Sequence, residues 1–199
     1  PLISSSTPRL LVRCAPKYRR VPDGSNVTPT VSLLSPSIPA DEAKMYVGLK
    51  PEDRMVLFVG RIEPLKGVDT LIQAMSCLQL KEKNRPVHLA IIGGDPGASP
   101  EEMTVEMARL QKLCDDLMVD QTVVFLGKRD QDKLPYYYSA AELVVMPSHY
   151  ESFGMVALEA MACGTPVLAF RNGSVAEVID DGVTGHIVET VAEAIVKIG

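Results

Sequence analysis

The most distinctive residues of this sequence are two acids on either side of a glycine-containing turn and an apolar run. Glu151 and Glu159 lie in the segment SHYESFGMVALEAMACG, residues 148–164. A carboxylate accepts several hydrogen bonds at once, so such a pair suits a ligand rich in hydroxyls, such as a sugar. Alternatively, both acids are surface charges, with Glu151 complementing a helix dipole. The apolar neighbours of Glu159, in VALEAMA, argue against that alternative, because acids are seldom buried without a partner.

A helix is expected to begin between these two acids. It starts near Phe153–Gly154 and ends at Gly164, a residue type common just past helix C-termini. The unpaired N–H groups and the dipole at its start favour an anion. Glu159 lies about one turn inside, and helical side chains lean toward the N-terminus. The segment could therefore offer phosphate-binding and hydroxyl-binding groups side by side.

Two cations stand in the segment GRIEPLKG, residues 60–67. Gly60 lets the backbone bend sharply and approach a ligand, and Arg61 and Lys66 could converge on a diphosphate. Equally, this could be a solvated loop in which the cations pair with Glu63. The segment is not a phosphate-binding P-loop, which needs a glycine-rich run ending in Gly-Lys-Ser/Thr.

The elements that must position these residues alternate short apolar runs with amphipathic stretches. Apolar runs of this length are typical of buried parallel strands. We expect strands at 55–60, 87–94, 122–127, 142–147 and 166–170, a last short strand within 180–188, and helices between them. The alternation predicts an α/β fold: a Rossmann-like, doubly wound parallel sheet with helices on both faces. Ligands of such sheets bind at the carboxyl ends of the strands, where the glycines and charges of this sequence concentrate.

Capping signals predict where three of the helices begin. Each is a Ser or Thr with a Gln or Glu three residues later. The sets are Thr70 with Gln73, Ser99 with Pro100 and Glu102, and Ser174 with Glu177. The tyrosines 136–138 are expected to pack on a short helix rather than to form a stacking platform. His149 has no paired acid in view and is not expected to act as a catalytic base.

Composition argues against several functional classes. The net charge of −5 disfavours a nucleic-acid partner. The longest apolar runs are far shorter than the roughly 20 residues of a transmembrane span. The four cysteines are scattered, which indicates free thiols and a reducing, cytoplasmic location. No His, Cys or Asp cluster has metal-ligand spacing, so no metal is expected.

Three stretches together carry a family resemblance: LFVGRIEPLKGVDTLIQAM, VVFLGKRDQDKLPYYYSAAELVVMPSHYESFGMVALEAMACGTPVLA and EVIDDGVTGHIV. They resemble the C-terminal domain of the family 4 retaining glycosyltransferases of the GT-B fold. Sucrose-phosphate synthases and the glycosyltransferases of mycothiol synthesis are similar. Two glutamates eight residues apart are a weak signal alone. Preceded in order by Gly-Arg-x(4)-Lys-Gly, they are a specific one.

The resemblance implies a role for each motif. Arg61 and Lys66 would hold the diphosphate of a nucleotide-sugar donor and stabilise the leaving group. Glu151 would bind hydroxyls of the donor sugar, and Glu159 the nucleotide ribose. These three groups, Arg61, Lys66 and Glu151, are the implied catalytic residues. The remaining implied donor-binding residues are Gly60, the backbone of Phe153, Gly154, Met155 and Val156, and Gly127, Lys128 and Arg129 beside the base. No metal or other cofactor is implied, because cations and a helix N-terminus supply the positive charge.

The resemblance also predicts the domain organisation. Residues 1–45 are interpreted as a linker and the remnant of an upstream acceptor-side domain, and residues 46–199 as the donor-binding domain. The chain would then be one half of a longer GT-B enzyme. It would bind a nucleotide-hexose, with UDP favoured, and be inactive alone because the acceptor-side domain is missing.

Two other interpretations compete with this one. The chain could be a non-enzymatic nucleotide-binding or regulatory module that needs a separate subunit. It could also be a flavodoxin-like or dinucleotide-binding domain, but the glycine fingerprint of the latter is missing.

Overall fold

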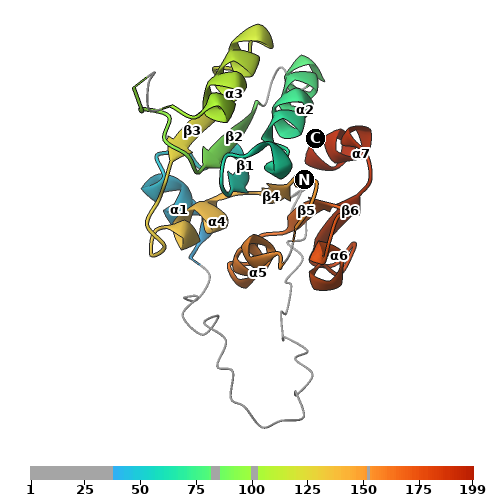
Figure 1. Cartoon of the computed structure of the whole chain (residues 1–199). Coiled ribbons are helices and arrows are strands. Elements are labelled where there is room, and N and C mark those ends of the chain that lie inside the picture. The colour runs from blue at the N-terminus through green and yellow to red at the C-terminus, as the bar shows by residue number, and fades with distance from the viewer. Residues whose placement is uncertain (1–37, 82–85, 100–102, 152) are drawn as a thin grey trace, which may run out of the picture.

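A single parallel sheet forms the centre of the computed structural model, which describes residues 38–81, 86–99, 103–151 and 153–199. All strand pairs are parallel, in the order β3-β2-β1-β4-β5-β6 (Figure 1). The strands are β1 (Arg54–Val59), β2 (Val87–Ile92), β3 (Val123–Gly127), β4 (Leu143–Met146), β5 (Val167–Phe170) and β6 (Gly185–Val188). The predicted α/β, Rossmann-like sheet is confirmed, including its short sixth strand.

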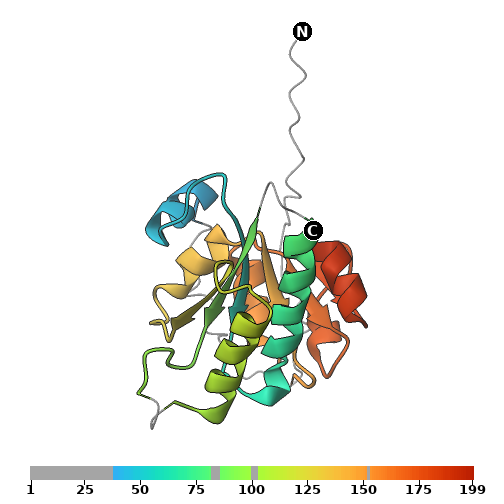
Figure 2. The same ribbon diagram turned by 90° about the horizontal axis from the view of Figure 1, so that it is seen from above.

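Helices cover both faces of the sheet (Figures 1 and 2). Buried side chains of α2, α3 and α7 pack on one face, and those of α1, α4, α5 and α6 on the other. The bounds are α1 (Ala40–Tyr46), the 3-10 turn η2 (Pro64–Lys66), α2 (Val68–Lys81), α3 (Val105–Asp116), α4 (Leu134–Ala140), α5 (Met155–Ala162), α6 (Val175–Val178) and α7 (Val191–Ile198). Because both faces are covered, β4 and all of β1 after Arg54 are apolar, as their sequences predict.

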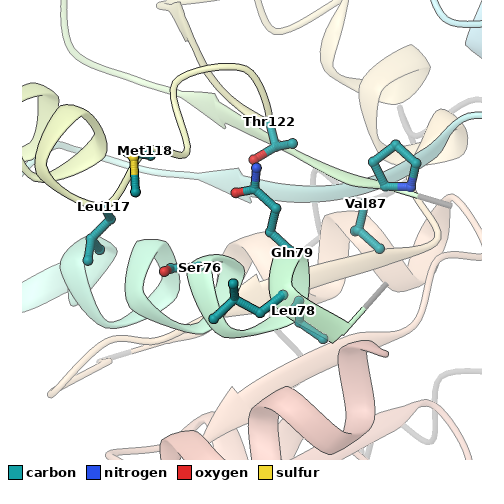
Figure 3. Close-up of a pocket in the computed structure, with 9 residues that line it drawn as sticks. Ser76, Leu78, Gln79, Val87, Leu117, Met118 and Thr122 are labelled. Carbon is teal, nitrogen blue, oxygen red and sulfur yellow. The ribbon is translucent and has the colours of Figure 1, made fainter. Parts of the chain in front are cut away.

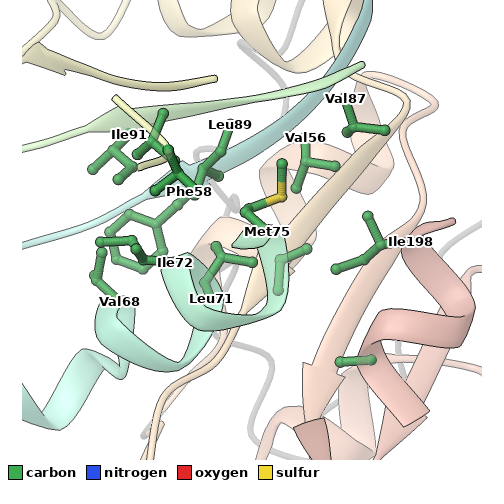
Figure 4. Close-up of a cluster of buried hydrophobic side chains, with 14 of the residues drawn as sticks. Val56, Phe58, Val68, Leu71, Ile72, Met75, Val87, Leu89, Ile91 and Ile198 are labelled. Carbon is green, nitrogen blue, oxygen red and sulfur yellow. The ribbon is translucent and has the colours of Figure 1, made fainter. Parts of the chain in front are cut away.

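The core under α2 shows how the sheet is held. Leu71, Ile72 and Met75 project from one side of the helix onto the side chains of β1 and β2 (Figure 4). Each of the three is at most 2% exposed. Burying one such side chain contributes about 1.5–3 kcal/mol. This packing fixes the amino end of α2, and with it the loop that follows β1.

The start of α2 differs from the prediction. The helix begins at Val68, so the predicted capping box of Thr70 with Gln73 lies inside its first turns. Gly67 adopts a left-handed conformation with φ 65° at the end of the 3-10 turn. Helical backbone therefore starts directly after it, three residues earlier than a Thr70 N-cap would place it. The side chain of Asp69 accepts a hydrogen bond from the Thr70 N–H.

The start of α3 also differs. The helix begins at Val105, and its N-cap is Thr104, whose hydroxyl accepts from the Met107 N–H at 3.2 Å. Ser99 was the predicted cap, and it lies before this point. Residues 100–102, which include the rest of the predicted signal, lie outside the described residues. Ser174 directly precedes α6, as predicted, but its side chain forms no cap hydrogen bond with the helix.

Helix α1 lies within the segment interpreted as a linker. Ala43 is fully buried, and Tyr46 stacks on Tyr136 of α4 with ring centroids 3.9 Å apart. Lys44 donates to two backbone carbonyls of the turn before β1, at 2.8 and 2.7 Å. Packing on the sheet domain therefore starts at about residue 40, before the predicted boundary at 46. Residues 1–37 of the predicted linker lie outside the described residues.

Candidate functional site

The strand order places the two charged segments next to each other. β1 is flanked by β2 and β4, so the order reverses between β1 and β4. Beyond the carboxyl ends of two such strands lies the crevice in which α/β sheets bind ligands. Residues 60–67 leave the end of β1, and residues 147–154 leave the end of β4. The segments that carry the predicted cations and the first predicted acid therefore meet at the switch point.

The backbones of these two loops are in direct contact. The His149 N–H donates to the Leu65 carbonyl at 2.9 Å. A Cβ added at Gly67 would lie 2.2 Å from the Pro147 carbonyl oxygen, and the φ of 65° is itself unfavourable for other residues. Gly67 is thus required both for its conformation and for the close approach of the two loops.

Gly60 contacts the end of β2 through its backbone. Its N–H donates to the Ile92 carbonyl at 3.0 Å, which extends the pairing of β1 and β2 by one bond. A Cβ at Gly93 would lie 1.9 Å from the Gly60 oxygen. The Gly93–Gly94 pair is therefore a packing feature of the strand end.

Lys66 and Glu151 form the central ion pair of the site. The Lys66 ammonium donates to Glu151 Oε2 at 2.8 Å, and the two side chains are only 21% and 18% exposed. Burial disfavours the charged form of Glu151. The hydrogen bond and charge of Lys66, with the N–H groups of Gly154 and Phe153, outweigh burial and lower the pKa. Glu151 is therefore an ionised carboxylate held between a cation and the start of α5.

The N-terminus of α5 faces the same place. Gly154 is its N-cap, with φ 63°, and its N–H lies 3.5 Å from Glu151 Oε1. The first N–H groups of any helix have no partner within the helix. Here they belong to Met155 and Val156, which the sequence predicted as backbone contacts. The Phe153 and Met155 side chains are exposed, so the loop offers its backbone together with an apolar rim.

Arg61 lies in a solvated loop and pairs with Glu63, which is one of the two alternatives that the sequence left open. Its guanidinium pairs with Glu63 at 2.8 Å, and its side chain is 78% exposed. Exposed pairs of this kind contribute about 0–1 kcal/mol, so the pair can be exchanged for another partner at little cost.

Glu159 has two donors, as an acid in an apolar helix requires. The Tyr138 hydroxyl donates to its Oε2 at 2.6 Å, and the Gln131 amide donates to its Oε1 at 3.3 Å. Tyr138 is fully buried, so this tyrosine packs as predicted. Its hydroxyl contact with Glu159 was not predicted. The two residues belong to different helices, α4 and α5, and no local sequence signal connects them.

The loop after β3 contains the predicted base-binding residues. Gly127 ends β3, and its carbonyl accepts from the Gly93 N–H at 3.0 Å. Lys128 and Arg129 are exposed. Arg129 Nε donates to the Tyr137 hydroxyl at 2.9 Å. The loop lies at the same edge of the sheet as the switch point, with β2 between β3 and β1.

The β5–α6 loop donates hydrogen bonds to the backbone of the segment that carries Glu151, which the sequence did not predict. The Ser174 N–H donates to the Glu151 carbonyl at 3.1 Å, and the Asn172 amide donates to the Ser148 carbonyl at 3.2 Å. A Cβ at Gly173 would lie 2.1 Å from the Glu151 backbone carbonyl oxygen. The only sequence signal was that RNGS follows a predicted strand.

Two hollows lie at the opposite edge of the sheet. One of about 430 Å³ is lined by the end of α2, by Leu117 and Met118 after α3, and by Val87 and Thr122 at the amino ends of β2 and β3 (Figure 3). A wider one of about 1270 Å³ borders the amino ends of β1, β4, β5 and β6. Neither contains the residues of the switch point, so neither is the candidate site.

Two features are absent from the described residues. Residues 38–81, 86–99, 103–151 and 153–199 contain no group of three or more His, Cys, Asp or Glu side chains that could hold a metal ion. In the same part of the chain, no helix is long and apolar enough to span a membrane.

Comparison with known proteins identifies the family. The model of "Glycosyl transferases group 1" matches residues 40–198. D-inositol 3-phosphate glycosyltransferase 2 of Catenulispora acidiphila is 40% identical over 168 residues, which are 79% of this chain and 38% of the relative. The chain therefore spans about two fifths of the length of that relative.

Two solved structures share the fold. Sucrose-phosphate synthase from Thermosynechococcus elongatus is 34% identical with a TM-score of 0.70, over 83% of this chain and 40% of that one. Anabaena Alr3699/HepE, in complex with UDP and glucose, is 27% identical with a TM-score of 0.67, over 80% of this chain and 41% of that one. The sheet is the Rossmann-like half of a GT-B fold, as the sequence predicted, and the chain belongs to the group 1 glycosyl transferase family.

Proposed function

We propose that this chain is the donor-binding domain of a retaining glycosyltransferase that transfers a hexose from a nucleotide-sugar, with UDP as the nucleotide. The observation that carries the proposal is the meeting of Lys66, Glu151 and the start of α5 at the topological switch point. A cation, a carboxylate and helix N–H groups are the partners that a sugar diphosphate needs. The HepE complex with UDP and glucose supports the choice of UDP.

Lys66 and Arg61 would bind the diphosphate. Lys66 is already half-buried beside α5, and Arg61 is held only by an exposed pair with Glu63. Charge that develops on the departing diphosphate would be stabilised by both cations and by the α5 dipole. In this proposal no metal ion is required, because these groups supply the positive charge.

Glu151 and Glu159 would bind hydroxyls at the two ends of the donor. Glu151 would accept from the sugar, and the base and ribose would extend toward Glu159 and the loop of Gly127, Lys128 and Arg129. Donor binding must then compete with the contact of Glu151 with Lys66 and Gly154. The diphosphate would take over the cation and the helix N–H groups, and the Glu151 carboxylate would turn to the sugar hydroxyls.

The acceptor side is expected elsewhere. The chain spans 38% of its relative from Catenulispora. A complete transferase would therefore need further residues to bind the acceptor, and the 199-residue chain alone would bind donor without turnover. The cytoplasmic location stays a prediction.

The proposal is tested by calorimetric titration of the chain with UDP, GDP and ADP, and then with UDP-glucose. We expect saturable binding of UDP and its conjugate. Arg61→Ala and Glu159→Ala should each weaken binding, because a contact to a charged group contributes roughly 1.5–3 kcal/mol. That range corresponds to an affinity loss of about 10- to 150-fold.

Two matched variants control for changes in net charge. Lys112→Ala removes an exposed cation that pairs with Asp116 on α3. Glu142→Gln neutralises an acid that pairs with Arg54 at the amino end of β4. Both should bind UDP like the unchanged chain. If Arg61→Ala and Glu159→Ala also bind like the unchanged chain, the assigned site is wrong. If none of the nucleotides binds to this chain or to a longer gene product, the proposed function is wrong.

A further inference from the structure

Glu159 is held by a side chain to which the family resemblance assigns no role. Tyr138 is 1% exposed, and its ring is part of the core between α4, α5 and the sheet. Its hydroxyl ends 2.6 Å from Glu159 Oε2. A neutral hydroxyl bound to a carboxylate makes a short, charge-assisted hydrogen bond, which is stronger than one between neutral groups.

The backbone of Tyr138 is fixed as well. The Thr165 hydroxyl donates to the Tyr138 carbonyl at 2.6 Å, and the Thr165 N–H donates to the Ala160 carbonyl of α5 at 3.0 Å. Thr165 thus ties the end of α4 to the end of α5, the helix that carries Glu159. These bonds hold the backbone of Tyr138 in a fixed place relative to α5.

The direction of the hydrogen bond determines what Glu159 can still bind. Tyr138 remains protonated and donates, because burial and the nearby Glu159 carboxylate raise its pKa. The second carboxylate oxygen accepts from Gln131 at 3.3 Å. An ionised carboxylate offers about four lone-pair sites and only accepts. After the two protein donors, about two acceptor sites remain, and they suit a pair of hydroxyl donors.

We propose that Tyr138 is a positioning residue that sets the specificity of this site for ribonucleotides. With Gln131, it orients Glu159 so that both carboxylate oxygens accept from the vicinal hydroxyls of a ribose. This inference rests on the proposed function. A nucleotide that lacks the 2′-hydroxyl would forgo one charge-assisted hydrogen bond to the half-buried Glu159 carboxylate. The unchanged chain should therefore prefer UDP over 2′-deoxy-UDP.

The experiment compares Tyr138→Phe with the unchanged chain by titration with UDP and 2′-deoxy-UDP. Phenylalanine keeps the buried ring and removes only the hydroxyl. We expect UDP affinity to fall about tenfold and the preference for UDP over 2′-deoxy-UDP to fall by a similar factor, as the loss of one charge-assisted bond predicts. A purely structural role of Tyr138 would weaken both ligands equally and leave their ratio unchanged.

The control is Tyr136→Phe on the same helix. Its ring stacks on Tyr46, and the substitution retains that stack. Both affinities should stay as in the unchanged chain. A second variant, Gln131→Ala, changes an exposed side chain and keeps the test available if Tyr138→Phe does not fold. Its preference for UDP should also fall, by a smaller factor.

The outcomes separate this inference from the proposed function. A folded Tyr138→Phe protein that binds UDP and keeps the original preference would overturn the role of Tyr138, and the donor site would stand. If Tyr138→Phe does not fold, Gln131→Ala decides. An unchanged preference of this variant for UDP over 2′-deoxy-UDP overturns the inference, and a reduced preference supports it. If the unchanged chain does not distinguish the two nucleotides, ribose recognition through an oriented Glu159 is wrong. If neither nucleotide binds to this chain or to a longer gene product, the proposed function and this inference fail together.

Discussion

The Lys66–Glu151 pair allows the sharpest test of how the site is held before any donor binds. Exposed ion pairs contribute about 0–1 kcal/mol, and removing one partner of a fully buried pair costs about 3–5 kcal/mol. With side chains 21% and 18% exposed, this pair lies between those limits. We expect Lys66→Met to lower the free energy of unfolding by about 2 kcal/mol at pH 7, because it leaves the Glu151 carboxylate without its cation.

A double-mutant cycle with Glu151→Gln isolates the pair itself. The matched control is the cycle of Arg171 and Glu189, whose paired side chains are 55% and 67% exposed. Urea unfolding of each variant, followed by circular dichroism, gives both coupling energies. We expect about 2 kcal/mol for the first pair and below about 0.5 kcal/mol for the second.

The coupling should also depend on pH with a definite sign. The pKa of Glu151 is lowered in the folded state, from an ordinary value of about 4.5. The folded protein therefore keeps this carboxylate ionised at a pH where the unfolded chain protonates it. Its stabilisation is complete above the unfolded pKa and is lost as the pH falls through the lowered folded value. A coupling energy no larger than that of Arg171 with Glu189, or equal at pH 7 and below pH 4, would refute this account of the pair.

Two further predictions concern backbone packing and thiol chemistry. Gly67→Ala should cost about 3 kcal/mol in urea unfolding, since it combines left-handed strain with a clash against the β4–α5 loop, whereas Gly164→Ala, with φ 80° but open space, should cost about 1–2 kcal/mol. Equal losses would show that the close approach of the loops is not required. At pH 8 an alkylating reagent should modify exposed Cys77 quickly and leave Cys114 and Cys163 unmodified until the protein unfolds, because burial raises the pKa of both thiols to about 11. Mass spectrometry of the labelled peptides checks this, and modification of either buried thiol as fast as Cys77 would contradict it.

Patterns that extend over a few residues were sufficient to predict the six strands and the helices between them, but not α1 or α7. The apolar run that became β1 is buried on both faces of the sheet, and its composition already indicates a central parallel strand. The glycine that becomes the N-cap of α5 was also found, because a turn residue before an apolar helix is a local signal. Helix starts were less accurate. Thr70 was predicted as the N-cap of α2, but the helix begins directly after Gly67. The left-handed conformation of this glycine ends the 3-10 turn, and the helix follows at once.

The candidate site was predicted only in part. Lys66 and Glu151 were expected to serve one ligand, and the structure brings them to 2.8 Å across 85 residues of chain. Arg61, expected beside them, pairs with Glu63 instead. The partners of Glu159 were missed, because the Tyr138 contact depends on how α4 packs against α5.

Local patterns in the chain are enough to predict which segments become strands, which edge of the sheet collects glycines and charges, and the family to which the motifs belong. These properties follow from local propensity and from the rule that parallel strands end at one edge. Three features emerge only from the folded protein: β1 and β4 are neighbours, the β5–α6 loop supports Glu151, and a buried tyrosine donates to Glu159. Such contacts join residues far apart in the chain, and their energies come from packing that exists only when the whole sheet has formed.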